Sequence, residues 1–280
     1  MKIKEIEAKN ILTKSNLGDM DYAINPYVGC AFACEYCYAI FMSKFSGERM
    51  EDWGNYVHVK KNAPDLLRQK LFKMKDKHSS IFISSVTDAW QYVERKYEIT
   101  RELLKILARD EYPGEITCHT KSPLIERDLD IIKTLPNVVV GITITSSEDS
   151  VSGFLEARAP KVSERLKTLK KFNENGIRTY AFIGPLLPHF YSRRDELDEV
   201  FKAIKNSGTN NIYVERLNFS NYISRRLKPV LDKADDKTKE SFINMKVGSE
   251  EYKKLNNFIL EMVKKYKMNL LNGTVIEHKK

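Results

Sequence analysis

Short apolar runs alternate along this chain with longer stretches in which apolar residues recur every three to four positions. The runs are rich in β-branched residues, which favours strands, and the stretches between them have the spacing of amphipathic helices. The clearest run is 138–143, and the clearest helical spacing joins Leu103, Leu104 and Leu107. Regular alternation of strand and helix predicts an α/β protein with parallel strands joined by right-handed crossovers.

The pattern divides the chain into expected elements. Strands are predicted at 22–28, 81–85, 115–119, 138–143, 179–183 and 211–217. Helices are predicted at 100–109, 129–135, 161–175, 196–206 and 250–265. The charged stretch 232–240 has almost no apolar residue and is interpreted as a surface linker. We therefore expect an N-terminal arm (1–20), a main α/β domain (21–230), and a linker with a C-terminal helix that packs on that domain (231–280).

Length and composition narrow the class of protein. The chain has 280 residues, of which 42% are hydrophobic and 30% charged, as in globular proteins with a heavily charged surface. No apolar run approaches the ~20 residues that span a bilayer, and no apolar signal segment opens the chain. A cytoplasmic protein without membrane contact is therefore expected.

The net charge of +9 favours partners that carry phosphates or other acidic groups. Most of the basic residues alternate with acids on predicted helices, where a solvated face is the usual interpretation. Charge alone leaves a nucleic-acid surface and an ordinary charged surface equally open.

Three of the four cysteines, Cys30, Cys34 and Cys37, lie in one short segment. Burial along one helical face is an alternative, but Pro26 and Gly29 argue against a continuous helix there. A zinc site usually needs a second pair of cysteines or histidines, and no histidine lies within twenty residues of this segment. Because an iron–sulfur cluster of four irons normally takes four thiolates, a set of three leaves one iron open for catalysis.

The order Cys-x3-Cys-x2-Cys, with an aromatic residue before the last cysteine, resembles the signature of radical S-adenosylmethionine (SAM) enzymes. The longer run 25–39 resembles the spore photoproduct lyase-like branch, the DNA repair photolyase type. Further segments resemble that branch in the same order: 85–91, 94–97, 120–123, 155–160, 163–166 and 183–185. The resemblance therefore covers about 20–220.

This resemblance implies a fold and a chemistry. The fold is a partial (β/α)6 TIM-like barrel with a C-terminal helical extension. The cofactors are a [4Fe–4S] cluster on the three cysteines and SAM, which is cleaved reductively to a 5′-deoxyadenosyl radical that abstracts hydrogen from a substrate. A nucleic acid is the substrate by analogy with the branch, and a flavodoxin- or ferredoxin-type protein is the expected external electron donor.

The resemblance and the positions at strand ends also imply a set of SAM-binding residues: Tyr36, Thr87, Asp88, Lys121, Thr143, Glu156, Arg158, Arg165 and Gly184. Tyr36 would lie near the adenine, with a core aromatic as the alternative. Lys121 would face the methionyl carboxylate unless it is simply solvated. Thr87 and Asp88 would hold the amino group or ribose hydroxyls, or else cap a turn.

For the remaining residues of this set the alternatives are also structural. Glu156, Arg158 and Arg165 would flank the cofactor, or form an ion pair that only supports the fold. Gly184 would shape a backbone wall against the adenine.

Two positions bear on the substrate. Cys118 is a weak candidate for hydrogen donation, and core packing is the usual role of a lone cysteine in a strand. Ser85 stands where spore photoproduct lyases resemble one another in having a hydrogen-donating cysteine, which argues against spore photoproduct repair. Modification of a peptide or protein, and a non-catalytic metal-binding role, are the alternative functions.

Overall fold

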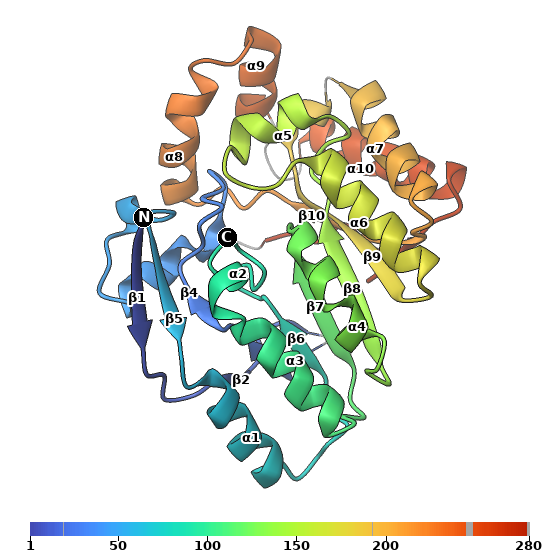
Figure 1. The fold of residues 1–280 in the computed structure, drawn as a ribbon. Helices are drawn as coiled ribbons and strands as arrows, with labels where there is room; N and C mark the ends of the chain where they lie inside the picture. Colours follow the sequence, from blue (N-terminus) through green and yellow to red (C-terminus); the bar gives the residue numbers. More distant parts are fainter. Residues whose placement is uncertain (19, 192, 245–248, 279–280) are drawn as a thin grey trace. The chain divides into compact units, whose positions relative to one another are not determined.

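The computed structural model of the chain describes residues 1–18, 20–191, 193–244 and 249–278 (Figure 1). It consists of two compact units. Unit 1 comprises Met1–Ala33, Ala39–Gly141 and Asn175–Arg178, and unit 2 comprises Cys34–Tyr38, Ile142–Glu174 and Thr179–Lys280. Each unit combines strands with helices.

Unit 1 contains two groups of strands. In the first, β2 (Leu12–Lys14) runs antiparallel to β3 (Tyr22–Ile24), which is followed by the parallel strands β6 (Ile81–Ile83) and β7 (Ile116–Thr120). The initial residues of β8 (Val138–Thr143) are also in this unit. In the second group, β5 (Tyr56–Lys60) lies between β1 (Lys2–Ile6), which is parallel to it, and β4 (Tyr27–Val28), which is antiparallel.

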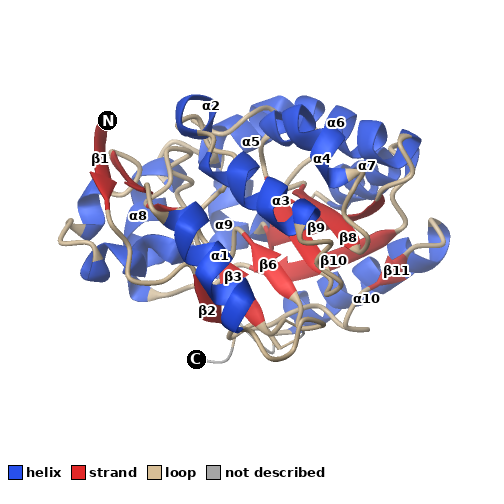
Figure 2. Cartoon of the chain, turned by 60° about the horizontal axis from the view of Figure 1, so that its bottom comes forward, coloured by secondary structure: helices blue, strands red, loops and turns tan. Residues whose placement is uncertain are grey.

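The helices of unit 1 are α1 (Ala63–Lys73), α2 (Glu94–Tyr97), α3 (Ile99–Arg109) and α4 (Leu129–Ile132), with 3-10 helices η2 (Met50–Asp52) and η3 (Pro123–Asp128). The 3-10 helix η1 (Tyr38–Phe45) follows the cysteine segment. Helices α1 and α3 pack against each other and lie over the same face of the β3–β6–β7 sheet (Figure 2). The spacing that predicts α3 is explained by burial, since Leu103, Leu104 and Leu107 are completely buried.

Unit 2 holds the parallel strands β9 (Arg178–Leu186), β10 (Asn211–Arg216) and β11 (Asn269–Leu270), with Ile212 of β10 opposite both Ala181 and Leu270. Its helices are α5 (Asp149–Leu155), α6 (Val162–Glu174), α7 (Arg194–Asn206), α8 (Asn221–Leu231), α9 (Asp236–Asn244) and α10 (Glu250–Lys265), with the 3-10 helix η4 (Pro188–Tyr191). The α10 helix has the predicted bounds and buries Leu255, Ile259 and Met262. None of the helices in the described residues is both long enough and apolar enough to cross a membrane.

Most of the predicted elements are confirmed, but the single strand expected at 22–28 is wrong. The chain forms β3 and β4 there, and these strands belong to different sheets. Pro26 has no N–H group for a strand ladder. The Asn25 side chain instead donates to Ser85 Oγ (2.9 Å) and accepts from the Val86 amide (3.0 Å).

The stretch 232–240, expected as a linker, contains the beginning of α9. The apolar residue that anchors this helix, Phe242, is buried and lies just beyond the stretch, which is why a window of charged residues did not indicate it. The arm expected at 1–20 contains β1 and β2. The proposed domain boundaries themselves remain a prediction.

Candidate functional site

The three clustered cysteines lie on the loop between β4 and η1. Cys30 belongs to unit 1, whereas Cys34 and Cys37 belong to unit 2. Two tight turns shape the loop: the Ala33 amide donates to the Cys30 carbonyl (3.2 Å) and the Cys37 amide to the Cys34 carbonyl (3.1 Å). Cys30 and Cys34 are buried, Cys37 is partly exposed, and none of these thiols is in a disulfide.

Among the described residues, no three histidine, cysteine, aspartate or glutamate side chains are already gathered as a metal site. The assignment of the three thiols as ligands therefore rests on their number and spacing, and it remains a prediction.

The first part of the loop is held within unit 1 by Gln91, a residue of the segment 85–91 for which the sequence indicated no role. Its completely buried side chain accepts from the Ala31 amide (2.8 Å) and donates to the Gly29 carbonyl (3.1 Å). Gly29 has φ +86°, and a Cβ built on it would lie 2.4 Å from the carbonyl oxygen of Tyr56. Only glycine fits this approach of the loop to β5.

We predict that Gly29→Ala strongly destabilises the protein, because the substitution adds a clash with the backbone to the cost of a positive φ. Gly47 is the matched control: its φ is +71°, and nothing lies within 4 Å of a Cβ built there. Gly47→Ala should cost about 1 kcal/mol and Gly29→Ala about 2 kcal/mol or more. Urea unfolding followed by circular dichroism measures both costs. Equal costs would show that the contact with Tyr56 does not constrain the loop.

Thr87 and Asp88 follow the end of β6 after three intervening residues, also in unit 1. The Thr87 hydroxyl donates to the Tyr27 carbonyl (3.3 Å). The Asp88 carboxylate accepts from the Thr120 hydroxyl (2.6 Å), the Lys121 amide (2.8 Å) and the Trp90 amide (2.9 Å). Burial raises the pKa of Asp88, and these hydrogen bonds oppose the rise. The structure thus brings together three predicted residues, Thr87, Asp88 and Lys121. It gives Asp88 the capping role and ties the Thr87 hydroxyl to β4; their contact with SAM remains a prediction.

A buried polar network in unit 1 was not recognised from the sequence. Tyr27 donates to Glu94, which also pairs with Arg127 (2.8 Å). Arg127 contacts Asp128 (2.9 Å), and Asp128 accepts from Trp90 Nε1 (2.8 Å). The Glu94 and Asp128 side chains are completely buried. No spacing in the sequence links these positions, because only the fold brings them together.

The later part of the loop is held within unit 2. Tyr36 donates its hydroxyl to Glu156, whose other carboxylate oxygen pairs with Arg165 (2.6 Å) and accepts from Thr145 (3.1 Å). The Glu35 amide donates to the Leu155 carbonyl (3.0 Å). Burial raises the pKa of Glu156, and the guanidinium of Arg165 opposes that rise.

The structure therefore assembles Tyr36, Glu156 and Arg165 as a buried network. Arg165 also donates to the Thr143 carbonyl (3.4 Å). The ion pair that was weighed as an alternative to cofactor contact is thus present, whereas Arg158 is exposed.

Two further predicted positions have packing roles. A Cβ built on Gly184 would lie 1.8 Å from the ring of Phe182, so the close packing there requires glycine. Cys118 is completely buried on β7, and burial raises the pKa of its thiol, as expected of a core cysteine. Contact of Gly184 with SAM and hydrogen donation by Cys118 remain predictions.

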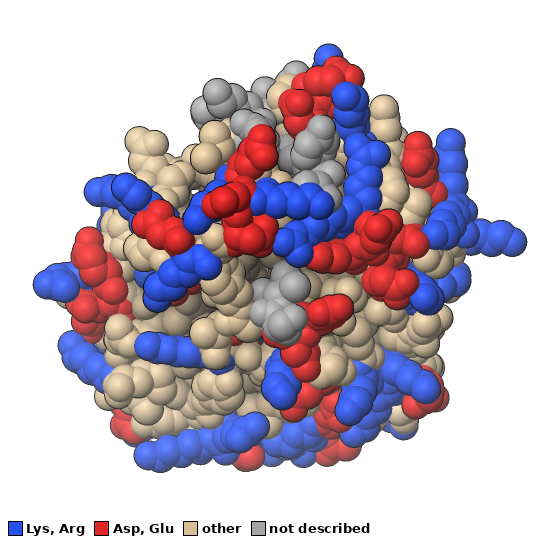
Figure 3. Space-filling view, turned by 90° about the horizontal axis from the view of Figure 1, so that it is seen from above, with Lys and Arg blue, Asp and Glu red and all other residues tan. Residues whose placement is uncertain are grey.

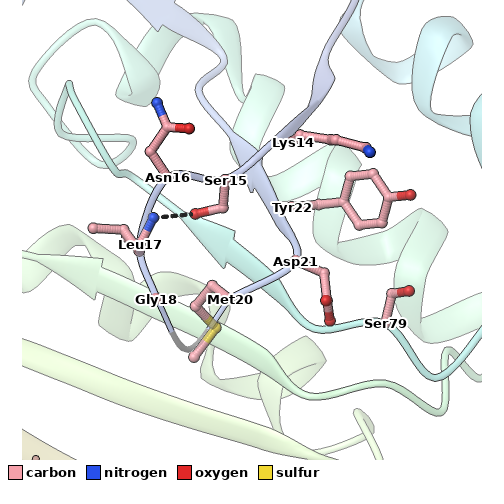
Figure 4. Close-up of a pocket in the computed structure, with 9 residues that line it drawn as sticks. All are labelled: Lys14, Ser15, Asn16, Leu17, Gly18, Met20, Asp21, Tyr22 and Ser79. Atoms are coloured by element: carbon pink, nitrogen blue, oxygen red, sulfur yellow. Dashed lines mark hydrogen bonds between the residues drawn. The ribbon is translucent and has the colours of Figure 1, made fainter.

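A hollow of about 480 Å³ on unit 1 is lined by the residues that connect β2 to β3 and by Ser79 (Figure 4). Asp21 borders it and accepts from the amide (2.8 Å) and hydroxyl (2.9 Å) of Ser80. The hollow lies at the amino end of β3, whereas the cysteine loop follows the carboxyl ends of β3 and β4. None of the predicted site residues lines it.

Comparisons with known proteins identify the family and the fold. The model of the radical SAM superfamily matches residues 24–204. An uncharacterized protein of Methanocaldococcus jannaschii is 38% identical over 188 residues, which are 67% of this chain and 69% of that protein. An uncharacterized protein of Acidianus two-tailed virus is 27% identical over 207 residues, 70% and 67% of the respective chains.

Two solved structures are similar in fold. Spore photoproduct lyase complexed with dinucleoside spore photoproduct matches with a TM-score of 0.71 and 15% identity, over 98% of this chain and 81% of that chain. Streptococcus suis SuiB bound to precursor peptide SuiA matches with a TM-score of 0.56 and 13% identity, over 92% of this chain and 48% of that chain.

The chain belongs to the radical SAM superfamily. It is an enzyme, and its mixed α/β fold with mostly parallel strands resembles the partial barrel of spore photoproduct lyase. The predicted family and fold class are confirmed.

Proposed function

We propose that Cys30, Cys34 and Cys37 bind a [4Fe–4S] cluster whose fourth iron is open to SAM. The observation that carries this proposal is the set of three thiols, outside any disulfide, on a loop within the matched family segment. Such a cluster, when bound with SAM, supplies an electron that breaks a carbon–sulfur bond of the sulfonium and yields a 5′-deoxyadenosyl radical. The donor set fits because three thiolates leave one coordination position for SAM.

The chain's own residues position these groups and exclude water. Gln91 holds the beginning of the cysteine loop, and the Tyr36–Glu156–Arg165 network holds its later part. Because Cys30 and Cys34 are buried, bulk water has limited access to this part of the loop. We further propose that Lys121 faces the methionyl carboxylate and that Thr87, Asp88, Thr143, Arg158 and Gly184 border the rest of SAM.

We propose a nucleic acid as the substrate. Support comes from the fold, which resembles that of a lyase complexed with a dinucleoside lesion, and from the net charge of +9. A flavodoxin- or ferredoxin-type protein is proposed as the electron donor.

The test is anaerobic reconstitution with iron and sulfide, followed by reduction in the presence of SAM. The expected result is about four irons per chain and release of 5′-deoxyadenosine. Zinc in place of iron, or iron without 5′-deoxyadenosine, would overturn the proposal. Labelled oligonucleotides then test the substrate: deuterium from a nucleic-acid substrate should appear in 5′-deoxyadenosine, and transfer from a peptide instead would support the alternative function.

We predict that the protein converts dinucleoside spore photoproduct to the repaired dinucleoside far more slowly than it forms 5′-deoxyadenosine. Ser85 would have to replace the thiol donor, and an O–H bond is much harder to break homolytically than an S–H bond. The Ser85 hydroxyl is also held by Asn25. Liquid chromatography of reconstituted reactions gives the product yield, with Ser85→Cys as the comparison. Formation of the repaired dinucleoside by the parent protein at the rate of 5′-deoxyadenosine formation would contradict this prediction.

A further inference from the structure

Helix α8 of unit 2 adjoins the cysteine loop through a contact that spans 191 positions of the sequence. Arg226 donates to the Glu35 carbonyl (3.4 Å) and forms an ion pair with the Glu35 carboxylate (3.0 Å). Glu35 stands between Cys34 and Tyr36 in the loop. The contact thus joins α8 to a residue between the proposed cluster ligands Cys34 and Cys37.

The two sides of α8 differ in chemistry. Ile223 and Leu227 are buried and pack the helix into unit 2. The other side, together with the residue that precedes the helix cap, presents two aromatic rings and two cations. We call this set the α8 surface; its residues are Phe219, Tyr222, Arg225 and Lys228.

The aromatic members are placed for contact with a planar group. Phe219 is 37% exposed and lies edge-on to Phe242, with ring centroids 6.3 Å apart. This contact holds the Phe219 ring in place. The guanidinium of Arg225 lies 5.7 Å from the centroid of Tyr222. Phe219 is exposed and Tyr222 is partly exposed, and rings of this kind next to an arginine suit the stacking of unpaired nucleic-acid bases.

The cations of the α8 surface are not neutralised. Segment 217–231 contains Arg225, Arg226 and Lys228 but no acidic residue. Among the described residues, neither Arg225 nor Lys228 has a carboxylate within ion-pair distance, although Arg225 is near the Asn221 carbonyl (3.4 Å).

Many other exposed cations of unit 2 are paired, as Lys202 is with Glu199 (3.0 Å) and Lys265 with Asp198 (2.8 Å). Figure 3 shows how acidic and basic side chains are interspersed over one face of the molecule. In the part of the chain that the structure describes, the α8 surface combines two unpaired cations with aromatic rings, and segment 217–231 has no acidic residue, which favours a partner that brings its own negative charges.

We infer that the α8 surface binds a single-stranded segment of nucleic acid, with bases against Phe219 and Tyr222 and phosphates against Arg225 and Lys228. This inference deepens the proposed function, on which it rests, by placing the substrate strand beside the cysteine loop. The two aromatic rings beside the cations suit flat bases better than the side chains of an acidic peptide, so the nucleic acid is favoured.

The test measures binding of a labelled oligothymidylate of about 12 nucleotides to the full reconstituted protein, by fluorescence anisotropy over a range of salt concentrations. Arg225→Glu should weaken binding at low salt by about tenfold and reduce the salt slope by about one. Tyr222→Ala should weaken binding by about tenfold and leave that slope unchanged, since stacking releases no counterions.

Lys170→Glu is the matched control, because it makes the same change in charge on α6, where Lys170 lies near Glu174 (3.8 Å). It should alter the affinity less than twofold. The side chains of Arg225 and Lys170 are both exposed. Thermal unfolding checks that all variants are folded. An RNA strand of the same base composition and a duplex serve as separate arms, and weaker binding of the duplex is expected.

Equal weakening by Arg225→Glu and Lys170→Glu, or no effect of Tyr222→Ala, would overturn the inference. Binding of an acidic peptide that depends on Arg225, without binding of the oligonucleotide, would overturn it as well. Because these measurements need no reductant, their failure is distinct from a failure to form 5′-deoxyadenosine, which would instead count against the proposed function.

Discussion

Replacement of Cys34 by serine is expected to abolish both iron–sulfur incorporation and SAM cleavage. A hydroxyl is a poor ligand for iron because it stays protonated, so only two thiolates of the loop would remain. The iron content should fall from about four to below one per chain, and 5′-deoxyadenosine formation by a factor of about 100 or more. Iron and sulfide analysis, visible absorption and product chromatography measure these losses, and Cys30→Ser and Cys37→Ser should behave alike.

Cys118→Ala provides the control, since Cys118 is the fourth cysteine and lies completely buried on β7. The variant creates a small cavity and should cost about 1 kcal/mol of stability while retaining the cluster. If Cys34→Ser kept its iron and its activity, or if Cys118→Ala lost its iron while folded, the assignment of the three loop cysteines would be wrong.

Arg165→Met is expected to have the largest effect on stability, because it leaves Glu156 buried without its cation. The side chains of this pair are 0% and 1% exposed, and removal of one partner from a buried pair typically costs about 3–5 kcal/mol. The loss should also loosen the loop, since Tyr36 donates to the same carboxylate. Urea unfolding measures the cost.

The cost of Arg165→Met should depend on pH in a defined direction. Burial already raises the pKa of Glu156, and removal of Arg165 takes away the main opposing effect. The folded variant then takes up a proton that the unfolded chain does not, so that its stability rises as the pH falls toward the raised pKa. The free energy of unfolding of the variant should therefore lie closer to that of the parent protein at pH 6 than at pH 8.

Two control variants test whether the cost comes from the buried charge. Lys202→Met breaks an exposed pair with Glu199 and should cost less than about 1 kcal/mol. The double variant Glu156→Gln with Arg165→Met should recover part of the loss, because it removes the uncompensated charge. A cost below 1 kcal/mol for Arg165→Met, or one that grows as the pH falls, would contradict the structural role of this pair.

Elements with a strong local pattern were predictable from the sequence. The β-branched run of β8 and the apolar face of α10 have the predicted bounds, since a single periodicity decides each of them. The break between β3 and β4 was missed because apolar residues stand on both sides of Asn25 and Pro26. It depends on the bonds of Asn25 to residues sixty positions away.

For the candidate site, features that depend on neighbouring residues were predictable, whereas those that depend on contacts between distant residues were not. The spacing of Cys30, Cys34 and Cys37 is local, and the sequence by itself determined the family, the cysteine loop and the positions after the strands. Only the tertiary structure decided that Gln91 holds one part of this loop, that Glu156 and Arg165 hold another, and that α8 adjoins Glu35. Such contacts join distant positions whose side chains carry no periodic signal, and they exist only once the elements have packed.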